Sequence, residues 1–402
     1  MKKLASKAVA AVLGYQVRKL RKKNNFKIIA VVGSIGKTST KLAIAQTLSS
    51  GFRVKSQEGN YNHLVTAPLV FFGEATPSLF NPLAWMAVFW RNQKKLRRPY
   101  QYDIVVLELG TDGPGQIAKF NNYLDLEIGV VSAISPEHME YFKSLDEVAR
   151  EELAIGQMSS LILANADLVD AKYLKDIPDV VTYAIKAAAD YNPNNLDVDT
   201  KLSEPEIYSR LAAAAVAQKL GMQTADIKKG LASIKPVAGR MQKLAGINGS
   251  TIIDDSYNAS PAAVKLALDS LYKTDAPQKI AVLGNMNELG DYSEKAHREI
   301  GEYCDPKQLS LVITIGPDAN NFLAAAAEAK GCQVKQFDSP YEAGEYIKSL
   351  VKLGALILVK GSQNKVFAEE AIKSILANAD DSSKLVRQSP DWLAKKQKMF
   401  GE

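Results

Sequence analysis

The residues with the clearest chemistry form the run Gly33-Ser34-Ile35-Gly36-Lys37-Thr38-Ser39, between an apolar strand-like stretch and a helix-like one. Backbone N–H groups in such a turn can point at phosphate oxygens, and the N-terminus of the following helix favours an anion. In this pattern Lys37 reaches the outer phosphates, and the hydroxyl of Thr38 ligates Mg²⁺. Ala30 stands where the full phosphate-loop pattern has its first glycine. The run predicts a nucleotide site, and a chance glycine-rich turn is the alternative.

Two further residues follow strand-like runs and could hold a metal ion. Glu108 lies at the end of an apolar run, where a carboxylate is well placed to hold Mg²⁺ beside bound phosphates. His138 follows another such run. A lone histidine is more often structural, but beside a phosphate loop and Glu108 it is a candidate metal ligand.

Other polar blocks recur along the chain without an obvious role of their own. They are Gly59–Pro68, Thr111–Gly115, Gly239–Met241, Ile253–Pro261, Val282–Gly290 and Val359–Ser362.

Short apolar runs alternate with helical patterns over most of the chain. The expected strands are 27–32, 103–109, 127–134, 161–164, 279–283, 311–315 and 355–359, and the expected helices include 41–48 and 206–220. This alternation predicts an α/β fold with doubly wound parallel sheets. We expect a P-loop-containing central ATPase domain with a parallel sheet, followed by a C-terminal Rossmann-like α/β domain.

The expected organisation has four parts. A basic N-terminal helix (1–25) precedes the central ATP-binding domain (26–236), which carries an apolar and basic insertion at 77–99; the C-terminal domain (237–379) and a loosely attached tail (380–402) follow.

Basic residues are concentrated at the N-terminus. Residues 1–27 hold nine of the Lys and Arg residues and no acid, although the whole chain has a net charge of only +6. This distribution argues against a nucleic-acid-binding protein. The helix 4–23 is expected either to pack on the body or to contact a membrane surface or a partner.

The segment 77–99 joins an aromatic, apolar half to a basic one. It contains Trp85 and Trp90, and Arg91, Lys94, Lys95, Arg97 and Arg98 follow. This composition suits peripheral contact with an anionic membrane, and a buried helical hairpin is the alternative. The apolar runs are too short for a membrane span, and two cysteines are too few for a disulfide framework, so we expect a cytoplasmic protein.

The order and spacing of these blocks resemble the Mur ligase family, ATP-dependent amide-forming ligases, over about residues 26–378. The most specific matches are Gly59-Asn-x-Asn62, Glu108-Leu-Gly110, His138 with Glu140-x-Phe142, Gly239-Arg-Met241, Asp254–Ala259 and Leu283–Gly290.

The resemblance implies that ATP phosphorylates a substrate carboxylate to an acyl phosphate, which the amine of an amino acid or a dipeptide such as D-alanyl-D-alanine then attacks. The carboxylate would belong to a cell-wall precursor peptide. Lys37, His138 and Glu152 are the implied catalytic residues, and ATP with Mg²⁺ is the implied cofactor set. Arg240, Asp255 and Asn258 would complete the nucleotide site, Asn60, Asn62, His63, Lys360 and Ser362 would contact substrate, and Thr38, Glu108, His138 and Glu152 would hold metal.

The chain also departs from the family pattern. Glu152 stands where the family has a carbamylated lysine, and it could ligate Mg²⁺ directly or through water, or be only a surface acid. Pro205-Glu206 and Gln363 replace a His-Asn pair and an arginine. Only about 25 residues precede the first core strand, so we expect the UDP-binding domain to be absent or supplied by a partner chain.

Two rival functions remain open. One, which these departures support, is a nucleotide-binding scaffold without turnover. The other is a ligase similar to folylpolyglutamate synthase.

Overall fold

The computed structural model describes residues 2–57, 59 and 61–401, and these form two units. One unit runs to Ser135 and resumes at Tyr141–Ile234; the other contains Pro136–Glu140 and the described chain from Lys235 onward. The expected boundary at 236/237 lies two residues beyond the end of the first unit. The inclusion of 136–140 in the second unit was not expected.

The first unit is built on a parallel sheet. Within the described residues the sheet has six strands in the order β2-β3-β1-β4-β5-β6, and every paired neighbour is parallel. The chain turns from one side of β1 to the other between β3 and β4, which puts the switch point beside β1. The strands are β1 (Lys27–Val32), β2 (Val54–Ser56), β3 (Ile104–Glu108), β4 (Ile128–Val131), β5 (Ile162–Asn165) and β6 (Val180–Tyr183).

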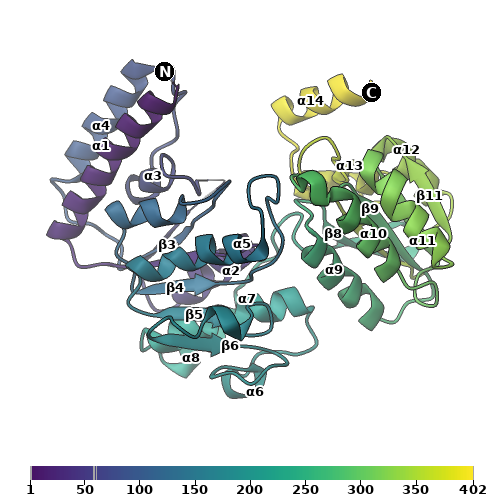
Figure 1. Ribbon diagram of the computed structural model, residues 1–402, viewed down its shortest axis with the longest axis horizontal. Coiled ribbons are helices and arrows are strands. Elements are labelled where there is room, and N and C mark those ends of the chain that lie inside the picture. Colours follow the sequence, from purple (N-terminus) through teal and green to yellow (C-terminus); the bar gives the residue numbers. More distant parts are fainter. Residues whose placement is uncertain (1, 58, 60, 402) are drawn as a thin grey trace. The chain divides into compact units, whose positions relative to one another are not determined.

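Helices α2 (Lys37–Leu48), α7 (Glu204–Lys219) and α8 (Thr224–Ala232) pack on one face of this sheet and share its main core (Figure 1). The run Ala212–Ala217 of α7 is almost completely buried, and its small side chains let α2 approach closely. The helix begins at Glu204 because Glu206 accepts a hydrogen bond from the backbone N–H of Ser203, which completes a capping box.

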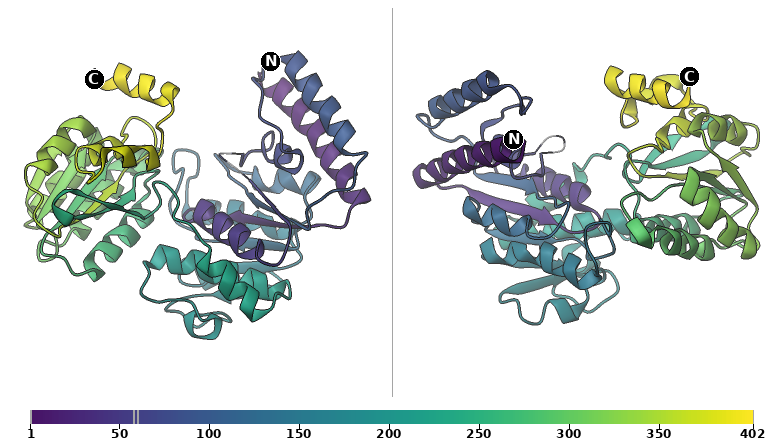
Figure 2. Two further views of the ribbon diagram at one scale, coloured as in Figure 1. Left: turned by 180° about the vertical axis from the view of Figure 1, so that it is seen from behind. Right: turned by 45° about the horizontal axis from the view of Figure 1, so that its top comes forward.

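Helices α1 (Lys2–Lys23) and α4 (Pro82–Lys95) lie side by side in the same unit (Figure 2). The remaining helical segments of this unit are α3 (Ala67–Phe72), α5 (Leu145–Leu153) and α6 (Pro193–Leu196), with the 3₁₀ turns η1 (Ile117–Asn122), η2 (Ala154–Met158) and η3 (Ala171–Tyr173). Among the helices of the described chain, none combines the length and apolarity needed to cross a bilayer.

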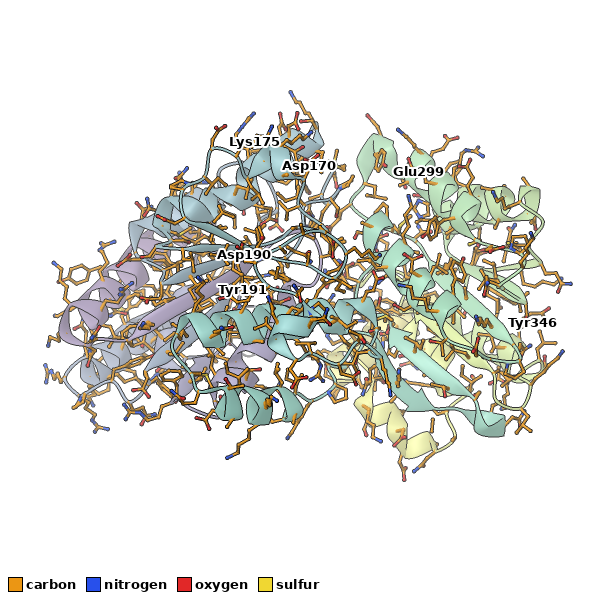
Figure 3. The ribbon with its side chains drawn as sticks, turned by 90° about the horizontal axis from the view of Figure 1, so that it is seen from below. Asp170, Lys175, Asp190, Tyr191, Glu299 and Tyr346 are labelled. Carbon is orange, nitrogen blue, oxygen red and sulfur yellow. The ribbon has the colours of Figure 1, made fainter. Side chains whose placement is uncertain are left out.

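The polar stretch after β6 is anchored to the body. The carboxylate of Asp190 accepts hydrogen bonds from the backbone N–H and the hydroxyl of Thr182, both at 2.8 Å. The next residue, Tyr191, lies beside α7, with the ammonium of Lys219 5.9 Å from its ring centroid (Figure 3). The stretch therefore belongs to the first unit as a fixed part.

The second unit has its own sheet, covered on both faces. In the described residues its strand order is β11-β10-β9-β12-β8-β7, parallel except for the β7–β8 pair. Helices α9, α10 and α11 pack on one face, and α12 and α13 on the other.

The strands of this unit are β7 (Gln242–Ala245), β8 (Thr251–Asp255), β9 (Lys279–Gly284), β10 (Leu311–Ile315), β11 (Val334–Phe337) and β12 (Leu356–Lys360). The helical segments are η4 (Ile247–Gly249), α9 (Pro261–Lys273), η5 (Gly290–Tyr292), α10 (Ser293–Tyr303), the π-helical turn η6 (Ala319–Ala324), α11 (Ala325–Ala329), α12 (Pro340–Lys348), α13 (Glu369–Lys373), η7 (Ala379–Lys384) and α14 (Pro390–Phe400).

The expected fold class is confirmed: two α/β units, each with a mainly parallel sheet. The expected strands 27–32 and 311–315 match β1 and β10 residue for residue. The helix expected at 41–48 begins four residues earlier, at Lys37, because it starts directly from the phosphate loop.

The contact between α8 and α2 leads to a test. A Cβ atom on Gly230 would lie 2.4 Å from the backbone carbonyl oxygen of Thr47, which cannot move aside. Alanine usually stabilises a helix interior relative to glycine. Here we expect Gly230→Ala to lower the free energy of unfolding by about 1–3 kcal/mol through overpacking. Urea unfolding of Gly230→Ala and of the control Gly156→Ala, whose Cβ would meet nothing closer than 3.8 Å, measures this. Equal stability of the two variants would contradict the packing.

Candidate nucleotide and metal site

The turn between β1 and α2 has the geometry of a phosphate-binding loop. Gly36 caps α2 with a left-handed backbone (φ 80°) and has no side chain to satisfy the N–H groups of the first helical turn. The N-terminal N–H groups of a helix are suited to donate hydrogen bonds to an anion. Gly33 has φ 123°, and a Cβ there would lie 2.5 Å from the hydroxyl oxygen of Ser132. Only glycine fits, because the loop passes directly against the chain that follows β4.

Serine hydroxyls hold this loop in place. The backbone N–H of Ser34 donates to the carbonyl of Ala133 (2.9 Å), and the Ser34 hydroxyl donates to the carbonyl of Ser135 (3.0 Å). The hydroxyl of Ser132 lies 2.6 Å from the carbonyl oxygen of Ile35. The loop is therefore preorganised by the polypeptide itself. Lys37, at the start of α2, turns its ammonium onto the carbonyl of Gly33.

The predicted Mg²⁺ ligands Thr38 and Glu108 meet in the structure. The hydroxyl of Thr38 donates to Glu108 Oε2 at 2.9 Å, because β1 and β3 are neighbours and both end at this edge of the sheet. A hydroxyl and a carboxylate are hard oxygen ligands, and here they lie within hydrogen-bond distance of each other, so this pair of donors fits Mg²⁺. In the described residues no cluster of three or more His, Cys, Asp or Glu side chains gathers to hold a metal.

Lys41 is a member of this site that the sequence analysis missed. Its ammonium is buried, donates to the carbonyl of Gln57 at 3.0 Å and lies 3.8 Å from Glu108 Oε2. The backbone N–H of Glu108 donates in turn to the side-chain oxygen of Gln57 at 2.6 Å. The spacing of the two lysines could have indicated this, because Lys41 lies one helical turn after Lys37 and therefore on the same side of α2.

Glu152 comes to the phosphate loop from α5. Its carboxylate is buried and accepts a hydrogen bond from the backbone N–H of Gly33 at 2.9 Å. The interpretation of Glu152 as a surface acid is therefore wrong. Its neighbour Glu151, which sequence reasoning missed, accepts from the backbone N–H groups of Gln116 and Ile117 at 2.7 Å and so fixes the start of η1.

The two blocks around Asn62 and Gly110 also lie together. The N–H of Gly110 donates to the carbonyl of Asn62 at 2.9 Å, and a Cβ on Gly110 would lie 2.7 Å from the Asn62 amide nitrogen. His63 is exposed, with Nδ1 3.8 Å from a carboxylate oxygen of Asp112. Asn60, a predicted substrate contact, lies outside the described residues.

The structure places His138 in the second unit, on the segment 136–140. Its Nδ1 lies 2.7 Å from a carboxylate oxygen of Glu288, and this hydrogen bond lowers the pKa of Glu288. Within the second unit, His138 is therefore joined to the Val282–Gly290 block. The two positive φ angles, 52° at His138 and 64° at Glu288, show that both side chains are presented by tight turns.

The polar blocks of the second unit converge on one small cleft. It is lined by residues 137–138, 258–260, 287–289 and 362–364, which include His138, Asn258 and Gln363. Lys360 and Ser362, predicted as substrate contacts, are buried and hold the blocks together. The ammonium of Lys360 pairs with Asp255 and donates to the carbonyl of Asn258 at 3.0 Å. The Ser362 hydroxyl accepts from the N–H of Asn287 at 2.9 Å.

Arg240 lies beside this group of loops. Its guanidinium carbon lies 4.2 Å from the ring centroid of Tyr257, and its Nε has no hydrogen-bond partner among the described residues although it is buried. A buried donor without a partner fits a residue that meets a ligand. The following N–H, of Met241, donates to Asp255 at 3.2 Å.

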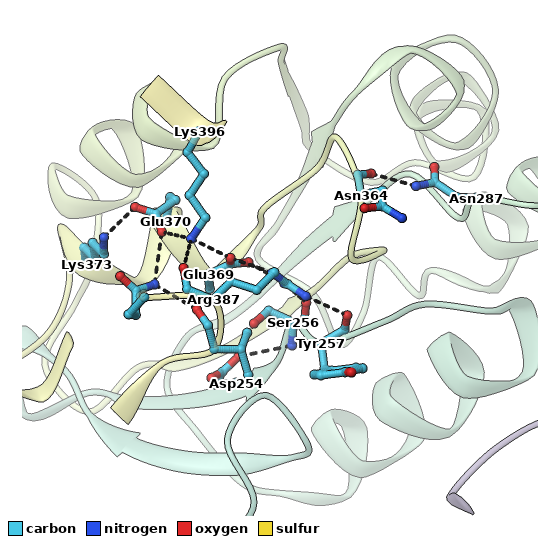
Figure 4. A network of polar contacts seen from close by, with 12 residues as sticks. Asp254, Ser256, Tyr257, Asn287, Asn364, Glu369, Glu370, Lys373, Arg387 and Lys396 are labelled. Carbon is cyan, nitrogen blue, oxygen red and sulfur yellow. Dashed lines mark hydrogen bonds and ion pairs between the residues drawn. The ribbon is translucent and has the colours of Figure 1, made fainter. Parts of the chain in front are cut away.

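A buried ionic network contacts the Asp254–Ala259 loop (Figure 4). Arg387 donates to the carbonyls of Ser256 (2.7 Å) and Tyr257 (3.0 Å) and forms a two-bond pair with Glu369. Lys396 of α14 is completely buried and pairs with Glu369 and Glu370. The expectation that the chain from 380 is loosely attached is therefore wrong, because two of its cations neutralise buried acids.

One α/β unit carries a phosphate loop, and a second α/β unit follows it. A phosphate loop between a strand and a helix is typical of enzymes that use nucleotides. Comparisons with known proteins agree with this architecture. Residues 31–217 match the Mur ligase middle domain, and residues 239–363 match the Mur ligase glutamate ligase domain. The chain belongs to the Mur ligase family.

Individual members of the family are similar to this chain over most of its length. The UDP-N-acetylmuramoyl-tripeptide–D-alanyl-D-alanine ligase of Bacillus subtilis (strain 168) is 26% identical over 380 residues, which cover 87% of this chain and 76% of that one. MurF from Acinetobacter baumannii matches with a TM-score of 0.74 at 20% identity, covering 91% of this chain and 79% of that chain. MurF ligase from Thermotoga maritima, solved in complex with ADP, matches with a TM-score of 0.72 at 22% identity, covering 93% and 84%.

Asp254 provides a pH-dependent test of the second unit. Burial raises its pKa to about 6 from 3.8, and Asp255 and Glu369 add to the rise while hydrogen bonds from Ser256 oppose it. The folded state therefore binds a proton at Asp254 more tightly than the unfolded state does. The resulting stabilisation of the folded state is complete below pH 3.8 and is lost as the pH rises through 6.

Between pH 4.5 and 7.5 the titration of Asp254 should lower the free energy of unfolding of the native protein by about 2 kcal/mol. The variant Asp254→Asn should not show this contribution. Urea unfolding at both pH values measures the difference, with the exposed Asp275→Asn as control. The same pH dependence in the native protein and in Asp254→Asn would contradict the assignment.

Proposed function

We propose that the protein is an ATP-dependent ligase that joins D-alanyl-D-alanine to the peptide of UDP-N-acetylmuramoyl-tripeptide. Membership of the Mur ligase family and the activity for which its relatives in Bacillus subtilis and Escherichia coli are named support this substrate pair. The observation that carries the proposal is the meeting of Thr38 and Glu108 beside a preorganised phosphate loop, because it supplies both the anion site and a metal-binding carboxylate.

The chemistry divides among residues of the first unit. The uncapped N–H groups of α2 would bind phosphate oxygens, and Lys37 would neutralise charge on the phosphoryl group as it moves to the substrate carboxylate. Mg²⁺, held by Thr38 and Glu108, would supply charge neutralisation between the phosphates when bound. The resulting acyl phosphate has a good leaving group, so an amine can displace phosphate and form the amide.

The remaining sites are proposed on the pattern of the family. Arg240, with its unpartnered Nε over Tyr257, would contact the nucleotide together with Asp255 and Asn258. His138 would serve as a further metal or phosphate contact, and Gln363 in the same cleft would face the incoming amine. Since the reaction consumes ATP and both cysteines are free thiols, we propose a cytoplasmic site of action.

Replacing Lys37 tests the phosphate loop. Lys37→Ala should lower ATP turnover by at least roughly a hundredfold without unfolding the protein, since it removes the charge that faces the transferred phosphate. ADP release with the muramoyl-tripeptide and D-alanyl-D-alanine is the measurement, and the exposed Lys172→Ala is the control. Equal turnover in the native protein and in Lys37→Ala would refute the role of the loop. Absence of ADP release from the native protein would favour the non-catalytic scaffold.

Glu152 gives an independent test of the same site. A carbamate forms on lysine only with CO₂, whereas the Glu152 carboxylate is present at pH 7 without it. We therefore expect turnover of the native protein to be unchanged in CO₂-depleted buffer. Glu152→Gln should raise the Mg²⁺ concentration needed for half-maximal turnover, since it removes a negative charge at the loop. Stimulation of the native protein by bicarbonate, or an unaltered Mg²⁺ profile in Glu152→Gln, would count against the assignment.

A further inference from the structure

Helix α4 has one buried face. Trp85 and Val88 are 3% and 1% exposed and pack with Leu13 of α1 in a small core of their own. The amide of Asn92 donates to the side-chain oxygen of Gln16 at 2.8 Å, and the amide of Gln16 donates to the carbonyl of Phe89 at 3.0 Å. These contacts fix the rotation of α4 about its axis, so its opposite face has a defined direction.

The opposite face of α4 is apolar and open. Leu83, Met86 and Trp90 follow one another at helical spacing and are 75%, 65% and 60% exposed, and Phe80, just before the helix, is 76% exposed. Scattered exposed apolar residues are normal, but three large ones along one face of a helix, with a fourth just before it, form a patch. We call this surface the α4 patch. For the segment 77–99 the sequence left open an exposed membrane contact or a buried hairpin. Trp85 is packed in a hairpin with α1, whereas Trp90 lies on the exposed face.

Positive charge borders the α4 patch. The 28 residues between Glu74 and Asp103 contain five Lys or Arg and no acid. The ammonium of Lys94 lies 3.3 Å from the ring centroid of Trp90, and Arg97 and Arg98 are exposed. Arg91 and Lys95 are partly balanced, since both pair with Glu74 at 2.6 Å. The adjacent helix α1 also contains no acid and has exposed basic residues at Lys7 and Lys22.

We propose that the α4 patch is a docking surface for an anionic lipid bilayer. An apolar helical face bordered by Lys and Arg, with an indole beside a cation, suits the boundary between acyl chains and acidic headgroups. Apolar residues enter the boundary, while the long basic side chains extend to the headgroups. At 14 residues α4 spans only about 21 Å, so it lies on the surface and does not cross it. This interaction is independent of the proposed ligase reaction.

Charge complementarity favours a bilayer over other occupants. A second copy of the chain would place like-charged basic borders against each other, which costs binding energy. An anionic surface instead meets each cation with an opposite charge, and each basic residue near such a surface raises the partition coefficient about fivefold.

Co-sedimentation with vesicles tests the proposal. One set contains phosphatidylcholine only, and the other contains phosphatidylcholine with phosphatidylglycerol. We expect binding to the anionic vesicles at low salt and release at high salt, because the charge contribution is screened. Leu83→Glu should abolish binding, whereas Leu353→Glu, a leucine 79% exposed in the second unit, should bind as the native protein does. Removing both charges in Arg97→Ala/Arg98→Ala should lower the partition coefficient by roughly 25-fold.

Trp90 gives a second readout at the patch itself. Its emission should shift to shorter wavelength with anionic vesicles, and Trp90→Phe should lose this shift while retaining binding. Native protein that stays in the supernatant with anionic vesicles at low salt would overturn the proposal. So would equal binding by Leu83→Glu and the native protein. A native oligomer that Leu83→Glu converts to monomer, without vesicle binding, would assign the patch to self-association instead.

Discussion

An anion-binding turn needs backbone N–H groups that no side chain of its own satisfies, and such a turn must be held open by its surroundings. In this protein the constraint falls on Gly33, where the loop passes so close to Ser132 that no Cβ fits. The hydrogen bonds between Ser34 and Ser135 and the carboxylate of Glu152 on the Gly33 N–H complete the support. The strands β1, β3 and β4 are neighbours in the sheet, and each brings one part of this support or of the candidate metal site to the same edge.

In the second unit, buried charged side chains hold the loops in place. Its loops are joined by Lys360 between Asp255 and the carbonyl of Asn258, and Arg387 holds the carbonyls of Ser256 and Tyr257. Desolvation offsets much of the attraction in a buried ion pair, so such pairs define geometry more than they add stability. Removing one partner, in contrast, would leave its counterpart buried and uncompensated. The loops are therefore fixed by ion pairs and hydrogen bonds within the unit itself.

Much of the fold could be predicted because its signals are local. Apolar runs of five or six residues that end in glycine mark β1 and β9, and the pairing of Thr38 with Glu108 follows from two strands that end at one edge. The strands β2, β6, β7, β8 and β11 were missed. Of these, β2 and β11 are partly exposed and carry no continuous apolar run.

The contacts that could not be predicted join distant residues. Arg387 and Ser256 are separated by 131 positions, and in the sequence each cation of the C-terminal segment is indistinguishable from a surface charge. Trp85 and Trp90 illustrate a further limit, since a separation of five residues turns side chains about 140° apart on a helix. The apolar composition of the segment therefore could not show which indole is buried until the packing of α1 fixed the rotation of α4.

The position of Lys41 affects how a divalent cation enters the site. Its buried ammonium lies 3.8 Å from the carboxylate of Glu108, so the positive and negative charges of this pair nearly cancel before any ligand arrives. A cation alone therefore meets little net attraction at Glu108. The phosphates of a nucleotide bring the missing negative charge to the same place. The protein is thereby suited to take up its metal ion together with the nucleotide, whose phosphates supply the negative charge that Lys41 offsets at Glu108.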